Sequence, residues 1–280
     1  MSEGRHTLIT LTTDFGMSDG YVGVMKGVIL RLNPDVTLVD LSHDIPPQGI
    51  ADAAYILRRA YEFFPPGTIH VVVVDPGVGT ERRAIVLSTP EATFVAPDNG
   101  VLTYVLDQAR TALQETRAVH LTNRHYWLRQ ASHVFHGRDI FAPVAAHLSL
   151  GVPLDQLGPW IEDLVTLPPP HLERQPGKIV GQVMHLDHFG NVLTNISPSD
   201  LESLGDAPTV QLGRLLISGL STAFAEGETG KPIAYMDSSG HLALAVVDGS
   251  AQERLHCRVG ELVEVSAHRP KYPAHGEPSD

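Results

Sequence analysis

The chain has 280 residues, of which 42% are hydrophobic and 19% charged, and its formal net charge is −12. A chain of this length can bury one large core, or a medium core and a smaller one. The acidic balance argues against a nucleic-acid-binding protein, which needs a basic face. No apolar run approaches the roughly 20 residues that span a bilayer.

The first part of the chain alternates strand-like and helix-like patterns. Strand-like apolar runs occupy residues 8–12, 36–41, 69–74, 84–87 and 93–96. Apolar residues at helical spacing lie between them, at 22–32, 50–60 and 101–106. Such alternation predicts βαβ units and a parallel sheet with right-handed crossovers. We therefore expect an α/β domain over residues 1–166.

Four aspartates, Asp14, Asp44, Asp75 and Asp98, each come just after one of the predicted strands. The carboxyl ends of parallel strands share one edge of a sheet, and ligands bind at this edge in open α/β folds. A single aspartate in such a place is more often a helix cap or a turn residue. Four of them at one edge indicate a polar site.

The most informative stretch follows the buried run 69–74 and reads Asp75-Pro76-Gly77-Val78-Gly79-Thr80-Glu81-Arg82-Arg83. Its glycines allow the backbone to approach a ligand closely. It is not a dinucleotide-binding fingerprint, because Arg82 occupies the third glycine position, and it lacks the Lys-Ser/Thr ending of a phosphate-binding loop. By itself the stretch fits a reactive turn and a plain turn with solvated arginines equally well.

A second motif, Phe135-His136-Gly137-Arg138-Asp139, places a histidine at the predicted start of a helix. His136 can be a reactive residue or a core histidine. A metal site is a further alternative, because His133 and His136 are three residues apart with Asp139 nearby, and His185 and His188 repeat this spacing. Zinc sites need other spacings and a further ligand, so we expect no metal.

Beyond residue 166 the pattern changes. The proline-rich segment 167–177 predicts a linker. Short apolar runs separated by turn signals follow at 179–184, 192–196, 210–212, 215–217, 232–235, 242–247 and 262–265. They predict a small antiparallel β-barrel domain over residues 178–266. The tail, residues 267–280, is rich in proline, histidine and charge and is predicted to be disordered.

Two further groups of residues suit a small ligand. Asp14 lies just before Ser18 and Asp19, which are candidate caps for the first helix, and its carboxylate can bind the two hydroxyls of a ribose. In the second domain, Asp187, Phe189 and Asn191 offer a carboxylate, an aromatic ring and an amide. This set suits an amino acid or a base. A turn between strands is the alternative for this second group.

Together these motifs resemble one family, the S-adenosyl-L-methionine (SAM) hydrolases or SAM hydroxide adenosyltransferases, relatives of the SAM-dependent fluorinase and chlorinase. The resemblance runs from about Leu8 to Val265 and rests on blocks in the same order at 12–16, 75–80, 82–83, 97–100, 135–139 and 189–191. It implies an N-terminal α/β domain, a C-terminal β-barrel, and a homotrimer that binds SAM between neighbouring subunits.

The resemblance also implies roles for single residues. In the hydrolases an Asp, an Arg and a His handle the water, and the matching positions are Asp75, Arg82 and His136. In the halogenases an aromatic residue takes the position of Asp75, so the chain resembles the hydrolase branch. The family's substrate contacts correspond to Asp14, Asp187, Phe189, Asn191 and Ser238. Segments 237–240 and 246–249 depart from the family's usual asparagine-containing pattern.

The expected reaction is hydrolysis of SAM to adenosine and L-methionine, by in-line attack of water on the ribose C5′, with no cofactor. Because the sulfonium leaves as a neutral thioether, no general acid is needed, and a dry pocket favours hydroxide attack on a cation. We expect Asp75 and His136 to accept protons of the water. Arg82 favours the charged form of Asp75, so that Asp75 orients the water more than it acts as a strong base.

Three other functions stay open at this point: a halide adenosyltransferase, a non-catalytic adenosine- or SAM-binding module, and a metal-dependent hydrolase. We expect the protein to be cytoplasmic. The single cysteine, Cys257, excludes an internal disulfide framework, and the short polar stretch 1–7 does not resemble a signal peptide. Neither nucleic acid nor a membrane is expected as a partner.

Overall fold

A computed structural model describes residues 7–205 and 207–267. The chain divides into two compact units, Met1–Pro168 and Pro169–Asp280. The strands of the first unit are β1 (Leu8–Thr13), β2 (Thr37–Ser42), β3 (Thr68–Val73), β4 (Ala84–Ser88), β5 (Ala92–Pro97), β6 (Arg117–His120) and β7 (Trp160–Ile161). Its helices are α1 (Tyr21–Leu32), α2 (Ile50–Ala60), α3 (Thr103–Thr111) and α4 (Ala142–Ser149), and a π-helical turn, Gly137–Phe141, leads into α4.

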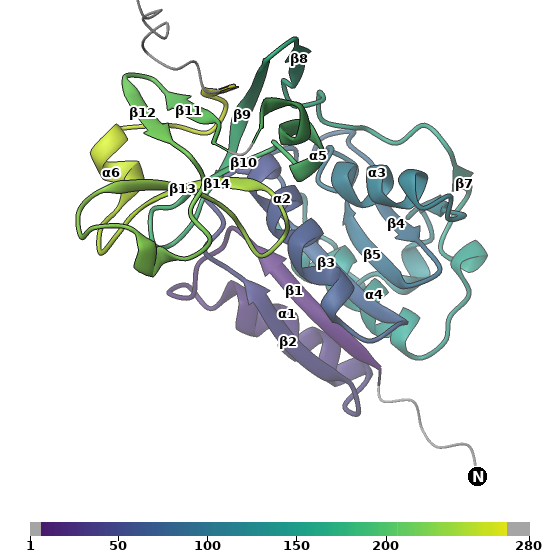
Figure 1. Ribbon diagram of the computed structural model, residues 1–280. Coiled ribbons are helices and arrows are strands. Elements are labelled where there is room, and N and C mark those ends of the chain that lie inside the picture. The colour runs from purple at the N-terminus through teal and green to yellow at the C-terminus, as the bar shows by residue number, and fades with distance from the viewer. Residues whose placement is uncertain (1–6, 206, 268–280) are drawn as a thin grey trace, which may run out of the picture. The chain divides into compact units, whose positions relative to one another are not determined.

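The first sheet has the strand order β2-β1-β3-β5-β4-β6-β7 (Figure 1). The α/β class is confirmed, and β2, β1, β3 and β5 are parallel as predicted. The prediction is wrong for the other half of the sheet, because β4 runs antiparallel to β5 and β6, and β7 antiparallel to β6. Only residues 89–91 join β4 to β5, which is too short for a crossover and forces a hairpin.

The central strand β3 is buried on both faces, as its unbroken apolar sequence predicts. Ile69, Val71 and Val73 pack in the core formed with α1 and α4. Val72 and Val74 belong to the opposite core, formed with α2 and α3. Successive side chains of a strand point to opposite faces, so this one strand joins the two helical layers. Its carboxyl end delivers Asp75.

The second unit is the antiparallel barrel-like sheet that the sequence predicts. Its strands are β8 (Glu173–Gln175), β9 (Lys178–Leu186), β10 (Val192–Thr194), β11 (Thr209–Leu212), β12 (Leu215–Ser218), β13 (Pro232–Met236), β14 (Leu242–Val246) and β15 (Leu262–Ser266), and its helices are α5 (Pro198–Leu201) and α6 (Ala251–Leu255). The order is β12-β11-β15-β9-β10-β14-β13, and β12 contacts β13, so the sheet nearly closes on itself. The free thiol of Cys257 is buried in its core.

Two further predictions concern the segment 167–177 and the tail 267–280. The segment 167–177, predicted as a linker, contains β8, which pairs with β9. The predicted tail, 267–280, lies outside the described residues except for Ala267.

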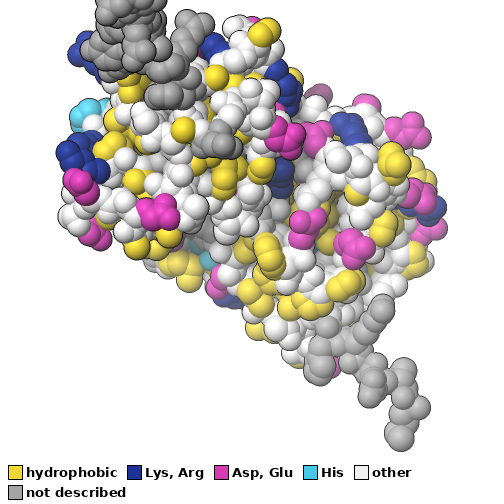
Figure 2. Space-filling model, in the orientation of Figure 1, with side chains coloured by type: hydrophobic (Ala, Val, Ile, Leu, Met, Phe, Trp, Pro, Cys, Tyr) yellow, Lys and Arg dark blue, Asp and Glu magenta, His cyan; other side chains and the backbone are white. Residues whose placement is uncertain are grey.

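No helix within residues 7–205 and 207–267 is long and apolar enough to cross a membrane. On the face shown in Figure 2, Lys and Arg side chains are scattered among Asp and Glu side chains and form no continuous basic patch over the described residues.

Candidate active site

Asp75, Arg82 and His136 are brought into direct contact, although they lie up to 61 positions apart in the sequence. The guanidinium of Arg82 forms a fork on the carboxylate of Asp75: Nε donates to Oδ1 at 2.8 Å, and one terminal nitrogen donates to Oδ2. The same terminal nitrogen lies 2.7 Å from Nδ1 of His136. Arg82 therefore holds the other two side chains together.

The contact with Arg82 fixes the protonation of His136. A guanidinium only donates hydrogen bonds, so Nδ1 of His136 must accept. The ring is then neutral and carries its proton on Nε2. Burial and the charge of Arg82 both lower the pKa of His136, and they outweigh Asp75 and Asp139, whose charges raise it. The neutral ring is thus the form that this arrangement favours.

The turn between β3 and β4 positions the first two residues. Asp75 follows the buried strand, and its backbone carbonyl accepts from Val78 at 3.2 Å, which closes the turn. The side chain of Arg82 folds back over this turn and its guanidinium lies 5.4 Å from the ring centre of Phe141. The side chains of Asp75 and Arg82 are only 5% and 10% exposed, so their fork is shielded from water and held more rigidly than a surface ion pair.

A cavity of about 780 Å³ lies beside this group of residues. Asp14, Asp75 and His136 line it, and Phe15, Tyr21 and Phe135 form an aromatic wall with ring centres 5.2–5.8 Å apart. A cavity of this size, mostly apolar with a few convergent polar groups, is typical of a small-molecule site. The structure thus brings four of the predicted site residues, Asp14, Asp75, Arg82 and His136, into one region of the first unit.

Asp14 is fixed by groups that the sequence did not reveal. Its Oδ2 accepts from the backbone N–H of Gln48 at 2.8 Å. Gln48 lines the cavity and has a φ of 64°, a conformation that costs a residue with a side chain roughly 1–2 kcal/mol. Glycine is the residue that most easily adopts a positive φ, so the sequence points to the neighbouring Gly49 and not to Gln48 for this conformation.

A buried histidine supports the loop that carries Asp14. Nδ1 of His43 lies 2.8 Å from Oγ1 of Thr13, and the His43 carbonyl accepts from the N–H of Gly16 at 2.9 Å. Its Nε2 lies 3.0 Å from Asp40, close enough for an ion pair but without the alignment of a good hydrogen bond. The predicted caps Ser18 and Asp19 do not cap α1, which begins after Gly20 without a side-chain cap.

The other two aspartates at the strand ends take no part in the cavity. Asp44 is exposed and does not line it. Asp98 is buried, accepts from Nε of Arg83 at 2.8 Å and from the N–H of Val165 at 2.9 Å, and so ties the end of the first unit to β5. Of the four aspartates at the strand ends, only Asp14 and Asp75 line the cavity.

In the second unit, Asp187, Phe189 and Asn191 share the turn between β9 and β10. Oδ1 of Asp187 accepts from the N–H groups of Phe189 and Asn191, at 2.9 and 2.8 Å, and Oδ2 accepts from the Asn191 amide at 2.8 Å. Asp187 thus organises its own turn. The ring of Phe189 is 75% exposed. Gly190, with φ 80°, is packed so closely that an added Cβ would lie 2.1 Å from Ser250.

Ser238 is exposed in a turn of the same design between β13 and β14, where Oδ1 of Asp237 accepts from the N–H groups of Ser239 and His241. The turn that holds Asp187 directly precedes β10, and the turn that holds Ser238 directly precedes β14, which is antiparallel to β10. The two turns therefore lie at opposite ends of this pair. The structure does not bring Ser238 beside Asp187.

The histidine pairs of the sequence do not gather further ligands. Within the described residues, no group of three or more His, Cys, Asp and Glu side chains is arranged to hold a metal ion.

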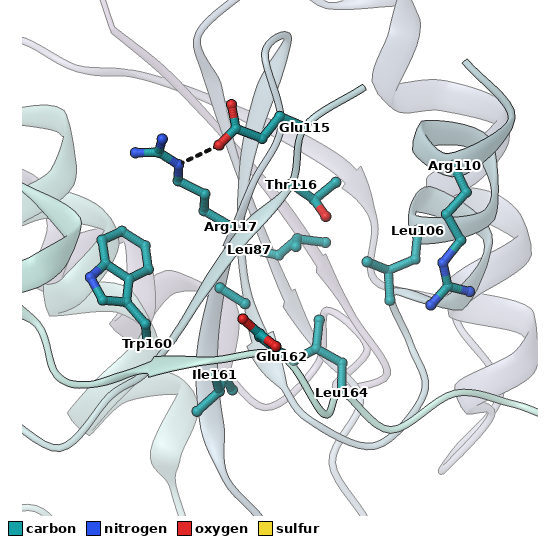
Figure 3. A pocket seen from close by; sticks show the side chains of 11 residues that line it. Leu87, Leu106, Arg110, Glu115, Thr116, Arg117, Trp160, Ile161, Glu162 and Leu164 are labelled. Carbon is teal, nitrogen blue, oxygen red and sulfur yellow. Dashed lines mark hydrogen bonds and ion pairs between the residues drawn. The ribbon is translucent and has the colours of Figure 1, made fainter. Parts of the chain in front are cut away.

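A second cavity, of about 600 Å³, lies near the edge strand β7 (Figure 3). Leu87, Ala118 and Ile161 stand in one row across β4, β6 and β7 and form its apolar floor. On its rim, Glu115 and Arg117 pair at 2.9 Å, as the dashed line in Figure 3 marks. None of the predicted site residues lines this cavity, so the candidate active site is the cavity beside Asp75.

Comparisons with known proteins agree with this choice of family. The profile of the SAM hydroxide adenosyltransferase N-terminal domain matches residues 9–158, and that of the C-terminal domain matches residues 181–264. The chain is 40% identical over 261 residues to the (R)-S-adenosyl-L-methionine hydrolase of Salinispora tropica, covering 92% of this chain and 97% of that protein. It is 39% identical to the Thermus thermophilus protein of the same name, covering 90% and 97%.

A solved structure is also similar. An uncharacterized conserved protein from Thermotoga maritima matches with a TM-score of 0.85 and 39% identity, over 92% of this chain and 99% of that one. Proteins named fluorinase are more distant, such as that of Nocardia brasiliensis at 30% identity over 94% of this chain and 98% of the relative.

Proposed function

This chain belongs to the SAM hydroxide adenosyltransferase family, and from this membership we propose that it hydrolyses S-adenosyl-L-methionine to adenosine and L-methionine. The observation that carries the proposal is the joining of Asp75 and His136 by Arg82 beside a cavity large enough for a nucleoside. The reaction needs a water placed in line with the ribose C5′. These three residues are the polar group that can place it.

In the proposed mechanism Asp75 orients the water and takes its proton late in the step, as the bond to C5′ forms. Each of its oxygens accepts one bond from Arg82 and keeps a lone pair for the water. The oxygen of the water bonds to C5′ while the C5′–S bond breaks, and the electron pair of that bond stays on sulfur. The sulfonium becomes a neutral thioether, so that a water-poor cavity favours the loss of charge.

The role of His136 differs from the sequence-based expectation that it accepts a second proton. Its Nδ1 is occupied by Arg82, and its Nε2 carries the proton, so the ring offers a hydrogen-bond donor to the ligand side. We assign His136 to orienting the water oxygen, and Asp75 alone to accepting the proton. Holding the water within reach of C5′ supplies much of the rate.

The substrate contacts are assigned by position. Asp14 faces the cavity and suits the ribose hydroxyls. From the family pattern alone we assign the remaining substrate contacts to Asp187, Phe189, Asn191 and Ser238. Phe189 is exposed in its turn, and Ser238 lies at the other end of the β10–β14 pair. SAM is the substrate, and the mechanism uses no cofactor.

We also propose the (R) configuration at sulfur for the substrate. The names of the relatives from Salinispora and Thermus specify this form. Sulfur in a sulfonium is a stereocentre, and its inversion places the methionine chain and the methyl group in exchanged positions. Separate assays of the two epimers test this choice, and equal turnover of both would contradict it.

A homotrimer with each site shared between subunits accounts for two exposed apolar groups. Met17, before α1, and Tyr21 and Val24, in its first turn, are 45–64% exposed, and Phe189 is 75% exposed. Tyr21 and Val24 are three residues apart and share one face of α1, and an exposed apolar face of this kind suits an interface. We place the protein in the cytoplasm, where its unpaired Cys257 stays reduced.

The test is to incubate the protein with SAM and separate the products. We expect adenosine and L-methionine well above spontaneous decay, and a loss of at least about 100-fold in kcat for Asp75→Asn. The matched control is Asp44→Asn, at the same sheet edge but outside the cavity, which should keep wild-type activity.

Other outcomes identify the alternatives. Chloride-dependent formation of 5′-chloro-5′-deoxyadenosine would indicate a halide adenosyltransferase, calorimetric binding without turnover a binding module, and loss of activity with a chelator a metal-dependent hydrolase. Each of these results would overturn the proposal.

A further inference from the structure

The segment 128–135, which we name the wall loop, borders two cavities. Ser132, Val134 and Phe135 line the active-site cavity on its inner side. Leu128, Arg129 and Gln130 line a shallow cavity of about 590 Å³ on its outer side. Phe135, at the end of the loop, packs on Phe15 and Tyr21. Hydrogen bonds hold the backbone of the rest of the loop.

One buried residue makes the hydrogen bonds that attach the backbone of this loop. The Asp139 carbonyl accepts from the N–H of Leu128 at 2.9 Å, its Oδ2 accepts from the N–H of Ser132 at 2.8 Å, and its own N–H donates to the Phe135 carbonyl at 3.1 Å. Asp139 therefore binds the beginning, middle and end of the wall loop. Among the described residues, no other backbone hydrogen bond joins the loop to the rest of the unit.

The carboxylate of Asp139 is kept charged although its side chain is completely buried. Burial would raise its pKa, but hydrogen bonds from Arg138 and Ser132 outweigh burial and lower it. Nε and a terminal nitrogen of Arg138 donate to its two oxygens at 2.6 and 3.0 Å, and the same guanidinium lies 5.1 Å from the ring centre of Phe135. A buried carboxylate with all these partners is rigid.

Asp139 lies in the π-helical turn that starts directly after His136. The N–H of Ala142 donates to the Gly137 carbonyl five residues earlier, and such turns are frequent at functional sites. The wall loop also rests on the turn that carries Asp75 and Arg82, because a Cβ at Gly79 would lie 2.2 Å from the carbonyl of His133. The loop is therefore packed between the turn that carries Arg82 and the helical turn that follows His136.

We propose that Asp139 is a positioning residue: it fixes the wall loop, and thereby holds His136 against Arg82 and shapes the wall of the substrate cavity. The catalytic part of this inference rests on the proposed function. The structural part does not, since it concerns the contact between His136 and Arg82 in the free protein.

Asp139→Asn is the direct test. The amide keeps the shape but has one acceptor oxygen in place of two. Its N–H₂ group therefore meets a donor in either orientation, the N–H of Ser132 or Nε of Arg138, and the charged anchor of the loop is lost. We expect kcat to fall about 100-fold, with a smaller change in KM.

The second measurement is the pKa of His136, followed by NMR titration of its ring. The charged and titratable groups around His136 are Arg82, Asp75, Asp139 and His133. If the loop moves, His136 gains water and loses Arg82, and its pKa rises. If Asp139 acted only through its charge, the substitution would lower this pKa, and a merely structural role would leave it unchanged. Either of the last two results overturns the proposal.

Two further variants keep the test decisive. Ser132→Pro removes the N–H that Asp139 accepts and leaves Asp139 and Arg138 in place, so it should reproduce the fall in kcat and the rise in the His136 pKa even if Asp139→Asn fails to fold. The control is Asp200→Asn, which alters a comparable carboxylate in the second unit. The Asp200 side chain is 2% exposed and accepts from the Ser197 N–H and from Arg174. This variant should be destabilised to a similar degree while kcat and the His136 pKa stay unchanged.

The titration also separates the two proposals. If the wild-type protein does not hydrolyse SAM, the proposed function fails, but the His136 pKa in Asp139→Asn still tests the anchoring. If the wild-type protein is active and neither loop variant changes kcat or this pKa, only the anchoring fails.

Discussion

At the scale of single residues, the neutral state of His136 makes the activity depend on pH. A protonated ring cannot accept the hydrogen bond of Arg82 and repels its charge. The pKa of His136 is lowered by burial and by Arg82, so protonation occurs only below the ordinary histidine value of about 6.5. We expect kcat/KM to be constant above that value and to fall at lower pH. A profile of kcat/KM against pH checks this, and an acid limb centred above about 6.5 would contradict it.

The backbone of Gln48 is strained, and this strain lowers the stability of the fold while it directs the Gln48 N–H at Asp14. Its φ of 64° is unfavourable for a side-chain-bearing residue, yet its N–H donates to Asp14. Replacing it with glycine removes the strain and should raise the free energy of unfolding by about 1 kcal/mol. We also expect a higher KM for SAM, because the loop becomes free to move away from Asp14. Denaturant unfolding and steady-state kinetics measure the two effects, and Gln108→Gly, in α3, should instead destabilise the protein.

At the scale of elements, a buried histidine couples the pairing of β3 and β5 to pH. His70 lies opposite Phe94, its ring stacks on that of Phe94 at 5.2 Å, and its Nδ1 lies 2.7 Å from Oγ1 of Thr10. Burial lowers the pKa of His70 to about 4. In the unfolded chain it is about 6.5, so the unfolded state binds a proton first as the pH falls.

The contribution of His70 to stability is therefore complete above about pH 6.5 and is lost as the pH falls toward about 4. We expect the free energy of unfolding to drop by roughly 3 kcal/mol over this window because of this residue. Urea unfolding at several pH values, compared with His70→Asn, isolates its share, since other groups titrate in both proteins. Equal pH dependence of the two proteins would show that His70 does not titrate in this range.

Most elements could be predicted because their apolar residues are periodic. The seven short runs after residue 178 all form strands, and the helix 50–60 begins and ends as predicted. The strand over residues 84–87 was predicted, but its antiparallel direction was not, although the few residues between it and β5 exclude a crossover. The strand β6 and the π-helical turn have no periodic signal of their own. Their structure is determined by tertiary contacts: β6 pairs with β4, and the π-helical turn packs in the core of the first unit.

The candidate site was less predictable than the fold, because the sequence does not show which side chains pair with one another. Asp75 and Asp98 follow similar strands, but Asp98 pairs with Arg83 away from the cavity, while Asp75 pairs with Arg82 beside it. Which arginine meets which aspartate depends on the tertiary structure. Gln48 and Asp139 act through backbone geometry and burial, which a single sequence does not reveal. Whether the family's substrate contacts apply here stays a prediction.

At the scale of the whole molecule, shared sites make a prediction about mixed subunits. Asp75→Asn removes the proton acceptor, and Phe189→Asp puts a charge in place of an exposed ring. Each variant alone should be inactive or nearly so. If one subunit supplies Asp75 and its neighbour Phe189, random mixed trimers regain roughly a quarter of wild-type activity. Subunit exchange followed by assay, with light scattering to give the mass, checks this. No regained activity would place each site within one subunit.

The buried position of Cys257 has a practical consequence. Burial raises the pKa of its thiol, so the group stays protonated and reacts slowly with alkylating reagents. A cysteine introduced at an exposed position such as Ser238 would then be the one reactive thiol of the chain. A fluorescent dye attached there could report ligand binding in real time, without first removing the native cysteine.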